Sequence, residues 1–261
     1  MPSPSTSPRT EREPSSVQSV VRRYHRVERV VSWLTAIASV GAFLGALAAL
    51  SLLPALGAAV VLLVALRAPV FRRRGTVRLR AEADPETVVD EFASATPPVL
   101  AFQWGVADEV VPGADERGGV DGNEPDTGTA PDATYAFSYL LGLRSVSLDL
   151  DVDVTRPNEA SDDGETPAEA VAVVDLDATA DGRPWGAYEV TVREDESLGG
   201  GEAEPEVPPG ESATLVDVEL RPARRFGLRR LPQGLVAERY YADVLAAQGY
   251  EVLDRAVSFS S

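Results

Sequence analysis

The sequence contains no cysteine, no lysine and only one histidine, His25. Without cysteine the chain forms no disulfides, thiolate nucleophiles, cysteine-ligated zinc sites or cysteine-linked lipid anchors. A single histidine standing among arginines provides neither a multi-histidine metal site nor a Ser-His-Asp triad within one chain. We therefore expect no catalytic residues, no metal site, no cofactor and no enzymatic activity.

Charge is absent between residues 30 and 66, within an apolar stretch that extends over residues 30–71. At ~1.5 Å per residue a continuous helix of that length would measure about 63 Å, roughly twice the ~30 Å hydrocarbon core of a bilayer. We therefore predict a two-helix transmembrane hairpin, with helices near residues 30–50 and 54–71. Pro54 supplies the break, because proline lacks an N–H and clashes with the preceding turn.

Arginine flanks this stretch on both sides, whereas the turn carries no charge. The flanking residues are Arg22, Arg23, Arg26 and Arg29 on one side and Arg67, Arg72, Arg73, Arg74, Arg78 and Arg80 on the other. The positive-inside rule then predicts a two-pass protein of the cell membrane with both termini cytoplasmic. A cleaved secretory signal is the alternative, but the apolar run continues past the cleavage-like Ala46-Leu47-Ala48. A twin-arginine signal conflicts with His25 and Arg26, which stand where apolar residues are expected.

Three other features surround the predicted hairpin. Residues 1–16 are rich in serine, proline and threonine, which is typical of a disordered tail. Residues 17–29 place valines and Tyr24 at helical spacing between arginines, which predicts a basic amphipathic helix on the anionic membrane surface or an ordinary extension of the first span. Gly41, Gly45 and Ala49 form a small-residue face for packing against the second helix or another copy of the chain.

The charge is divided sharply along the chain. Residues 1–74 hold ten arginines and three glutamates, so residues 75–261 hold the remaining 14 arginines against 38 acidic residues, a net of −24. At 1 M salt the Debye length falls to ~3 Å, which screens the self-repulsion of such a domain. The acidic, lysine-free composition resembles proteins of halophilic archaea, with an acidic protein from a high-GC mesophile as the alternative. It also argues against nucleic acid as a partner.

Residues 75–261 predict an α+β fold: a cytoplasmic antiparallel-sheet domain with two packed helices. Asp84-Pro85-Glu86 is a helix start, and Gly249 is a C-cap for a helix that carries Val236, Tyr240 and Val244. Strands are expected over residues 76–81, 99–106, 134–141, 144–154, 170–178, 186–192, 214–220 and 250–259. The intervening residues 107–133, 155–169 and 193–212 are dense in Gly, Pro, Asp and Glu, and we expect disordered loops there.

Aspartates alternate with apolar residues in two of these strands, at Asp149, Asp151 and Asp153 and again at Asp175 and Asp177. A row of metal-binding carboxylates is one interpretation. A half-buried strand with an acidic solvent face is the interpretation we favour, because alternation alone predicts it.

The order of strand, helix, antiparallel strands and terminal helix resembles the helix-grip fold of START-like domains. That resemblance implies a cavity for a lipid or another apolar ligand between the sheet and the last helix. The sequence departs from this pattern in showing one early helix and a strand after the last helix, and it contains no motif of the family.

One positive cluster stands in the acidic domain, interleaved with Phe226 and Leu228. It consists of Arg221, Arg224, Arg225, Arg229 and Arg230. These residues are candidates for contact with anionic lipid headgroups or an acidic partner, or for pairing with the domain's own carboxylates. We expect a membrane-tethered interaction or scaffold module that meets membrane lipids and a protein partner or a second copy. A lipid-binding module is the alternative, and a cavity of a few hundred Å³ would favour it.

Overall fold

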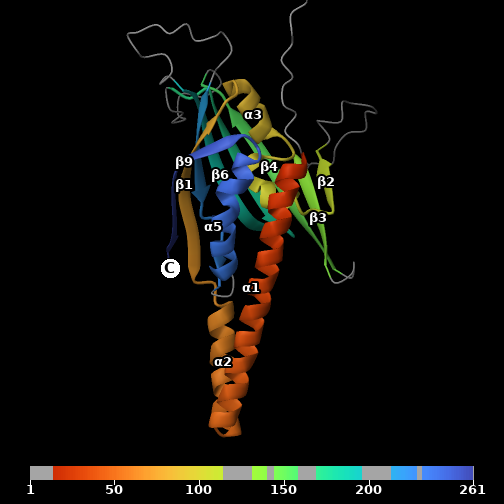
Figure 1. Ribbon diagram of the computed structural model, residues 1–261, viewed down its shortest axis with the longest axis vertical. Helices are drawn as coiled ribbons and strands as arrows, with labels where there is room; N and C mark the ends of the chain where they lie inside the picture. Colours follow the sequence, from red (N-terminus) through yellow and green to blue (C-terminus); the bar gives the residue numbers. More distant parts are fainter. Residues whose placement is uncertain are drawn as a thin grey trace, which may run out of the picture.

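The computed structural model describes residues 14–113, 131–139, 144–157, 169–195, 213–227 and 231–260. Figure 1 shows a twisted sheet with helices packed on one face, above a stem of two helices. The mixed α+β class and the antiparallel sheet are confirmed. The expected disordered segments 107–133, 155–169 and 193–212 lie largely outside the described residues, as does most of the tail 1–16.

The sheet is antiparallel throughout, in the order β2-β3-β4-β5-β6-β7-β1, with β8 and β9 also paired to β1. Its strands are β1 (Phe71–Ala81), β2 (Glu109–Pro112), β3 (Ala133–Tyr139), β4 (Arg144–Thr155), β5 (Ala172–Ala180), β6 (Arg183–Glu194), β7 (Thr214–Arg221), β8 (Arg225–Phe226) and β9 (Tyr250–Ser260). The turn between β5 and β6 has positive φ at Asp181 and Gly182, as a two-residue hairpin loop requires.

Local sequence signals explain several elements. Helix α3 (Pro85–Ala93) begins at Asp84, whose carboxylate accepts a hydrogen bond of 2.9 Å from the Thr87 N–H. Helix α5 (Leu231–Ala246) is followed by Gly249, which takes a φ of 85° before β9 begins. The predicted start of α3 is confirmed, whereas α5 ends at Ala246, three residues before the predicted cap.

One predicted strand is wrong. Residues 99–106 form a 3-10 turn, η1 (Pro98–Leu100), and a short helix, α4 (Ala101–Trp104). A short apolar run fits a buried strand and a buried helix equally well, because both surround it with apolar side chains. Here Val99, Leu100 and Ala101 are buried, and Gly105 lies so close to Val21 that a Cβ would stand 3.0 Å from it.

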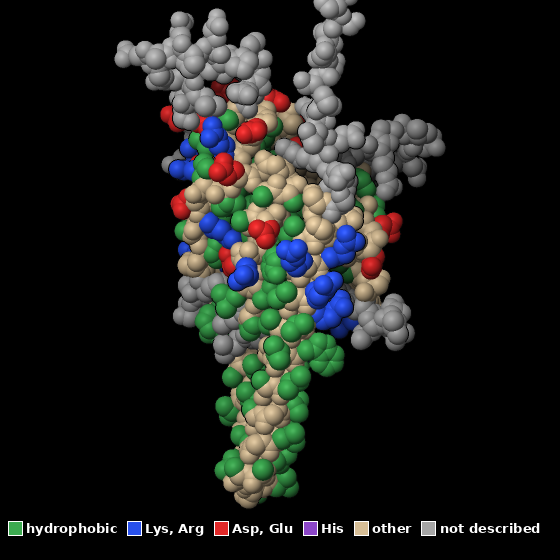
Figure 2. All heavy atoms as spheres, viewed as in Figure 1, with side chains coloured by type: hydrophobic (Ala, Val, Ile, Leu, Met, Phe, Trp, Pro, Cys, Tyr) green, Lys and Arg blue, Asp and Glu red, His purple; other side chains and the backbone are tan. Residues whose placement is uncertain are grey.

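The stem consists of residues 30–49 of α1 (Pro14–Ala49) together with α2 (Leu52–Arg67), which lies beside α1 (Figure 1). Among the described residues, α1 alone is long and apolar enough to be a membrane span or a signal sequence, and α2 is shorter. The stem's apolar side chains are exposed, for example Trp33 at 66% and Leu53 at 81%. Figure 2 shows a continuous apolar surface there, with basic side chains gathered just above it.

The N-terminal part of α1 belongs structurally to the sheet domain. Val17 and Val21 pack in one cluster with Ala101 and Val244, and the Tyr24 ring lies 4.4 Å from Phe102. The apolar face of residues 17–29 is therefore covered by protein and is not free to lie on a membrane surface. The expected domain start at residue 75 needs the same correction, because β1 begins at Phe71 and residues 17–29 complete the domain.

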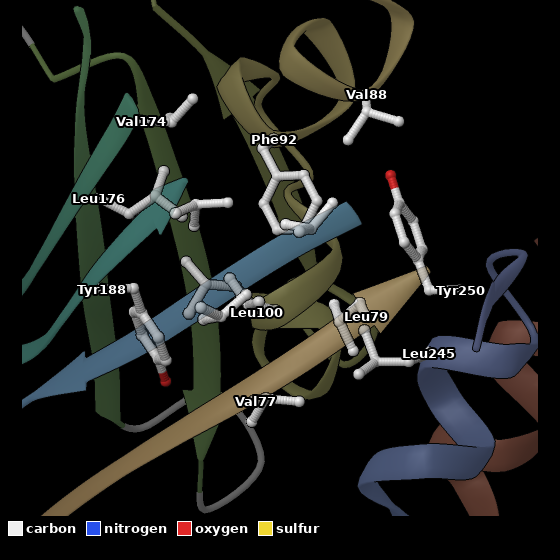
Figure 3. Packing of buried hydrophobic residues seen from close by; sticks show 14 of the residues in the cluster. Val77, Leu79, Val88, Phe92, Leu100, Val174, Leu176, Tyr188, Leu245 and Tyr250 are labelled. Atoms are coloured by element: carbon white, nitrogen blue, oxygen red, sulfur yellow. The ribbon is translucent and has the colours of Figure 1, made fainter. Parts of the chain in front are cut away.

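The main core lies between the inner face of the sheet and helices α3 and α5. Figure 3 shows Leu79, Phe92, Leu100 and Leu245 converging there, with Tyr188 at one side. The Tyr250 hydroxyl donates a hydrogen bond of 2.6 Å to Glu91 on α3. On the opposite face of the sheet, the alternating aspartates of β4 and β5 pair in register as Asp151 with Asp177 and Asp153 with Asp175.

Candidate ligand-binding cavity

A cavity of about 780 Å³ lies between the inner face of the sheet and helices α1 and α5. This cavity lies close to the stem, because Leu66 at the end of α2 and Phe226 of β8 both line it. The volume falls within the ~300–1,000 Å³ typical of small-molecule sites.

Most of the lining is apolar. It includes residues of α4, β3, β4, β6 and β7, namely Phe102, Phe137, Val146, Leu148, Trp185 and Leu220. Gly186 of β6 also lines the cavity, and a Cβ placed on it would meet only the Tyr188 ring, at an ordinary contact of 3.5 Å. The wall at this point is open because glycine contributes no side chain to fill it.

The wall nearest α1 is polar. Tyr24, His25 and Glu28 line the cavity from α1, and the Nδ1 atom of His25 lies 2.9 Å from the Glu28 carboxylate. Glu28 also accepts a hydrogen bond from Tyr24. Helix α5 is tied to the same face of α1, because Gln233 Nε2 donates a hydrogen bond of 2.9 Å to Ser32 Oγ.

Arg73 enters this wall from β1. Strand alternation turns Arg73 to the inner face together with Val77 and Leu79, whereas Arg72 and Arg74 are exposed on the outer face. Its guanidinium pairs with Glu238 of α5, and Arg255 of β9 pairs with the same carboxylate. Two cations therefore share one anion at the edge of the cavity.

Burial determines the ionisation of the groups around this pair. It raises the pKa of Tyr188 and Tyr241, so both phenols are protonated at neutral pH. The pKa of Tyr24 is also raised, first by burial and then by the Glu28 charge. Burial lowers the pKa of Arg255, which stacks 4.1 Å from the Tyr241 ring centroid, while Glu238 opposes that shift.

Three atoms of this wall are buried without a hydrogen-bond partner among the described residues. They are His25 Nε2, Arg73 Nε and Gln103 Oε1. All three side chains line the cavity. Buried polar atoms are normally paired, so unpaired ones that face an open space mark positions where a ligand or water would supply the partner.

The predicted membrane-facing arginines divide into several groups. Arg22, Arg23, Arg26 and Arg29 are exposed on α1, and Arg225 is exposed on β8. Arg221 pairs with Asp175 at 2.9 Å and with Glu189 on the outer face of the sheet, as the alternative of internal pairing predicts. Arg224 stacks 5.3 Å from the Trp185 ring centroid. Arg229 and Arg230 lie outside the described residues.

The segment around β8 does lie at the stem. Val70 N donates a hydrogen bond of 3.2 Å to Phe226 O, and a Cβ on Gly227 would stand 2.8 Å from Leu66 O.

The small-residue face of α1 does not pack against the second helix. A Cβ on Gly41 or Gly45 would meet no atom within 4 Å, so these glycines, and with them the face they share with Ala49, are not packed against α2. Packing against a second copy of the chain stays a prediction.

Sequence analysis implied a cavity only through the START-like resemblance and did not anticipate that α1 lines it, although one signal for that lining exists. Tyr24, Glu28, Ser32, Thr35 and Ser39 recur at spacings of three and four and all line the cavity from one face of α1. Within the stem, Thr35 Oγ1 and Ser39 Oγ donate to the carbonyls of Val31 and Thr35, at 2.9 and 2.8 Å. Among the described residues no group of three or more His, Asp or Glu side chains is placed to hold a metal ion.

Comparison with models of protein families gave no match, and a search of curated proteins gave none either. Among solved structures, the Mll3558 protein from Rhizobium loti is 18% identical and covers 68% of this chain and 98% of its own, with a TM-score of 0.31. An uncharacterized protein from Rhizobium leguminosarum is 15% identical with the same coverage and a TM-score of 0.25. At these TM-scores the likeness supports no argument about fold or function.

Proposed function

We propose that this protein is a membrane-anchored module that binds an amphiphile in the cavity between its sheet and helices α1 and α5. The cavity of about 780 Å³ carries the proposal, because a pure interaction module would have a filled core at this position. The lining suits a lipid: most of it is apolar, and one wall holds paired and unpaired polar groups.

The position of the cavity favours a ligand that comes from the bilayer. Leu66, Phe226 and Trp185 line its end beside the stem. The polar stripe of α1 continues from Tyr24 and Glu28 into the stem through Thr35 and Ser39. An amphiphile that moves along this stripe keeps its polar end beside hydroxyl groups while its chain stays among apolar side chains.

We propose that α1 and α2 cross the membrane as a pair, which makes the protein two-pass with both termini cytoplasmic. Residues 30–49 of α1 extend about 30 Å, and α2 about 24 Å, at ~1.5 Å per residue. The exposed apolar stem supports insertion into lipid, and arginine flanks both helices while the turn has no charge.

The environment we propose is a salt-rich cytoplasm of the halophilic type. A net charge of −17, the absence of lysine and the aspartate row on the outer face of β4 and β5 support it. The same acidity argues for partners other than nucleic acid. A scaffold role without catalysis is the second candidate, favoured by the exposed row Arg22, Arg23, Arg26 and Arg29, which suits an acidic partner.

The test is to identify what the full-length protein retains. The chain is purified with surrounding lipid in polymer-bounded discs in molar KCl, and bound lipids are quantified by mass spectrometry. We expect one class of amphiphile to be enriched over the bilayer, and Gly186→Leu to reduce that enrichment by filling the cavity. Gly57→Leu is the matched control, because a Cβ on Gly57 in the stem meets no atom within 4 Å.

Two outcomes would contradict the proposal. One is a lipid profile in the discs that equals the bulk membrane. The other is an enriched lipid that Gly186→Leu and Gly57→Leu leave at the same level as the unmodified chain, because that lipid would bind outside the cavity.

A further inference from the structure

Three unpaired polar atoms come from three separate elements and meet one cavity. Arg73 lies on β1, His25 on α1 and Gln103 on α4, and Arg73 Nε, His25 Nε2 and Gln103 Oε1 are buried with no hydrogen-bond partner among the described residues. Each unpaired atom costs folding stability. Three such atoms in one wall indicate a feature that is completed by something bound.

Tyr24 joins the three residues into one wall. Its ring centroid lies 4.8 Å from that of His25 and 4.4 Å from that of Phe102, the neighbour of Gln103. The Arg73 charge acts on the Tyr24 phenol and opposes the rise in its pKa. The wall is therefore a compact polar patch on one side of an otherwise mainly apolar cavity.

The charges of this patch favour an anion. Arg73 and Arg255 share the single carboxylate of Glu238, so the cluster lacks one negative charge. Arg224 lines the cavity as well, and Glu28, the one carboxylate among the described lining residues, already pairs with His25 and accepts from Tyr24. A positive patch of this kind is conspicuous in a molecule whose net charge is −17.

We propose that Arg73, His25 and Gln103 bind the anionic oxygen headgroup, carboxylate or phosphate, of the amphiphile whose chain fills the apolar part of the cavity. The inference rests on the proposed function and specifies its ligand class. Arg73 Nε donates to the anion as a charge-assisted hydrogen bond. His25 faces the anion through Nε2 while Nδ1 contacts Glu28, and the Gln103 amide donates after exchanging its oxygen and nitrogen positions.

The test uses the full-length chain in discs of zwitterionic lipid in molar KCl, in a Trp33→Phe background that removes the exposed indole of the stem. Trp185 lines the cavity, so dibrominated stearate bound there quenches its fluorescence; Trp185→Phe shows which part of the signal comes from the cavity. Dibrominated stearyl alcohol has the same chain without the anion, and inorganic phosphate is the anion without a chain.

We expect stearate to quench Trp185 at concentrations at least about tenfold lower than the alcohol, in line with the strength of charge-assisted hydrogen bonds. Arg73→Gln and Gln103→Leu should remove that difference. Arg72→Gln, one residue away on the exposed face of β1, should leave it unchanged. Gln103→Leu also removes an unpaired buried amide, so its thermal midpoint should not fall, and Glu238 keeps Arg255 as a partner in Arg73→Gln.

Equal quenching by stearate and alcohol, unchanged in both variants, would overturn the headgroup assignment and leave the proposed function in place. The absence of Trp185 quenching by either probe would overturn the proposed function itself. Displacement of stearate by inorganic phosphate at equal concentration would assign the patch to a free anion and overturn the assignment to an amphiphile.

Discussion

Replacing Gly186 by leucine distinguishes an open cavity from a filled core by the sign of the change in stability. Gly186 lies on the inner face of β6 beside Tyr188, and a Cβ there meets nothing closer than 3.5 Å. The added side chain projects into the cavity of about 780 Å³. In a packed core the same substitution would force neighbouring side chains out of their preferred rotamers.

The expected magnitude follows from two contributions. Full burial of a leucine side chain contributes ~1.5–3 kcal/mol, of which we take about half because the cavity is partly open to solvent. Replacing glycine in a strand restricts the unfolded chain and contributes a further ~0.4–1 kcal/mol. We expect Gly186→Leu to raise the free energy of unfolding by about 1–2.5 kcal/mol, whereas overpacking would lower it by ~1–3 kcal/mol.

The assay is denaturant unfolding of the full-length chain in lipid discs and molar KCl, followed by circular dichroism. Gly75→Leu is the control for overpacking, because a Cβ there would stand 2.7 Å from Ala256 O and 2.9 Å from Val257 Cγ2. We expect Gly75→Leu to destabilise the protein. If Gly186→Leu lowers the unfolding midpoint as much as Gly75→Leu does, the cavity is not available to an added side chain and the reasoning is refuted.

Three further predictions concern topology and charge. Reporter fusions after residues 16 and 261 should both report a cytoplasmic location, and an extracytoplasmic signal from the C-terminal fusion would contradict the two-pass proposal. The full-length chain in discs should lose cooperative unfolding at 50 mM KCl, where the Debye length exceeds ~10 Å and the acidic residues repel one another, and should regain it in molar KCl. Equal cooperativity at both salt concentrations would contradict the proposed halophilic environment. Burial and then the charges of Asp132, Asp149 and Asp177 raise the pKa of Asp151 above 3.8, so its stabilising effect is present at low pH and is lost as pH rises through its folded-state pKa. Asp151→Asn should therefore raise stability at pH 7 in molar KCl, by less than ~1 kcal/mol because the group is exposed, and the gain should vanish near pH 3 in unfolding titrations.

The strands and helix boundaries that sequence predicted are those set by local chemistry. Alternation in β4 to β7 follows from one buried and one solvated face, and the acidic cap at Asp84 fixes the start of α3. The prediction of a strand at residues 99–106 was wrong, because burial on all sides removes the periodic signal that separates a strand from a helix.

The polar wall was not predicted, because its members are distant in sequence. His25, Arg73 and Gln103 are brought together by the packing of α1 against α5 and α4. Arg73 also lay in a run of three arginines that suggested a uniform membrane-facing group. Because β1 begins at Phe71, strand alternation places Arg73, the middle arginine of the run, on the inner face of the sheet.

The continuity of α1 connects the stem to the cavity. One helix, Pro14–Ala49, supplies the packing surface of Val17 and Val21, the polar wall of the cavity and then the apolar stem. An α-helix without proline or glycine breaks transmits rigid-body motion along its length, and the segment from Ser15 to Val40 contains neither residue. If the stem lies in a bilayer as proposed, its tilt would change the position of Tyr24, His25 and Glu28 relative to Arg73 on β1. Under the proposed function, ligand binding that closes this wall would in turn favour one orientation of the stem, which would give a physical route from an occupied cavity to the stem.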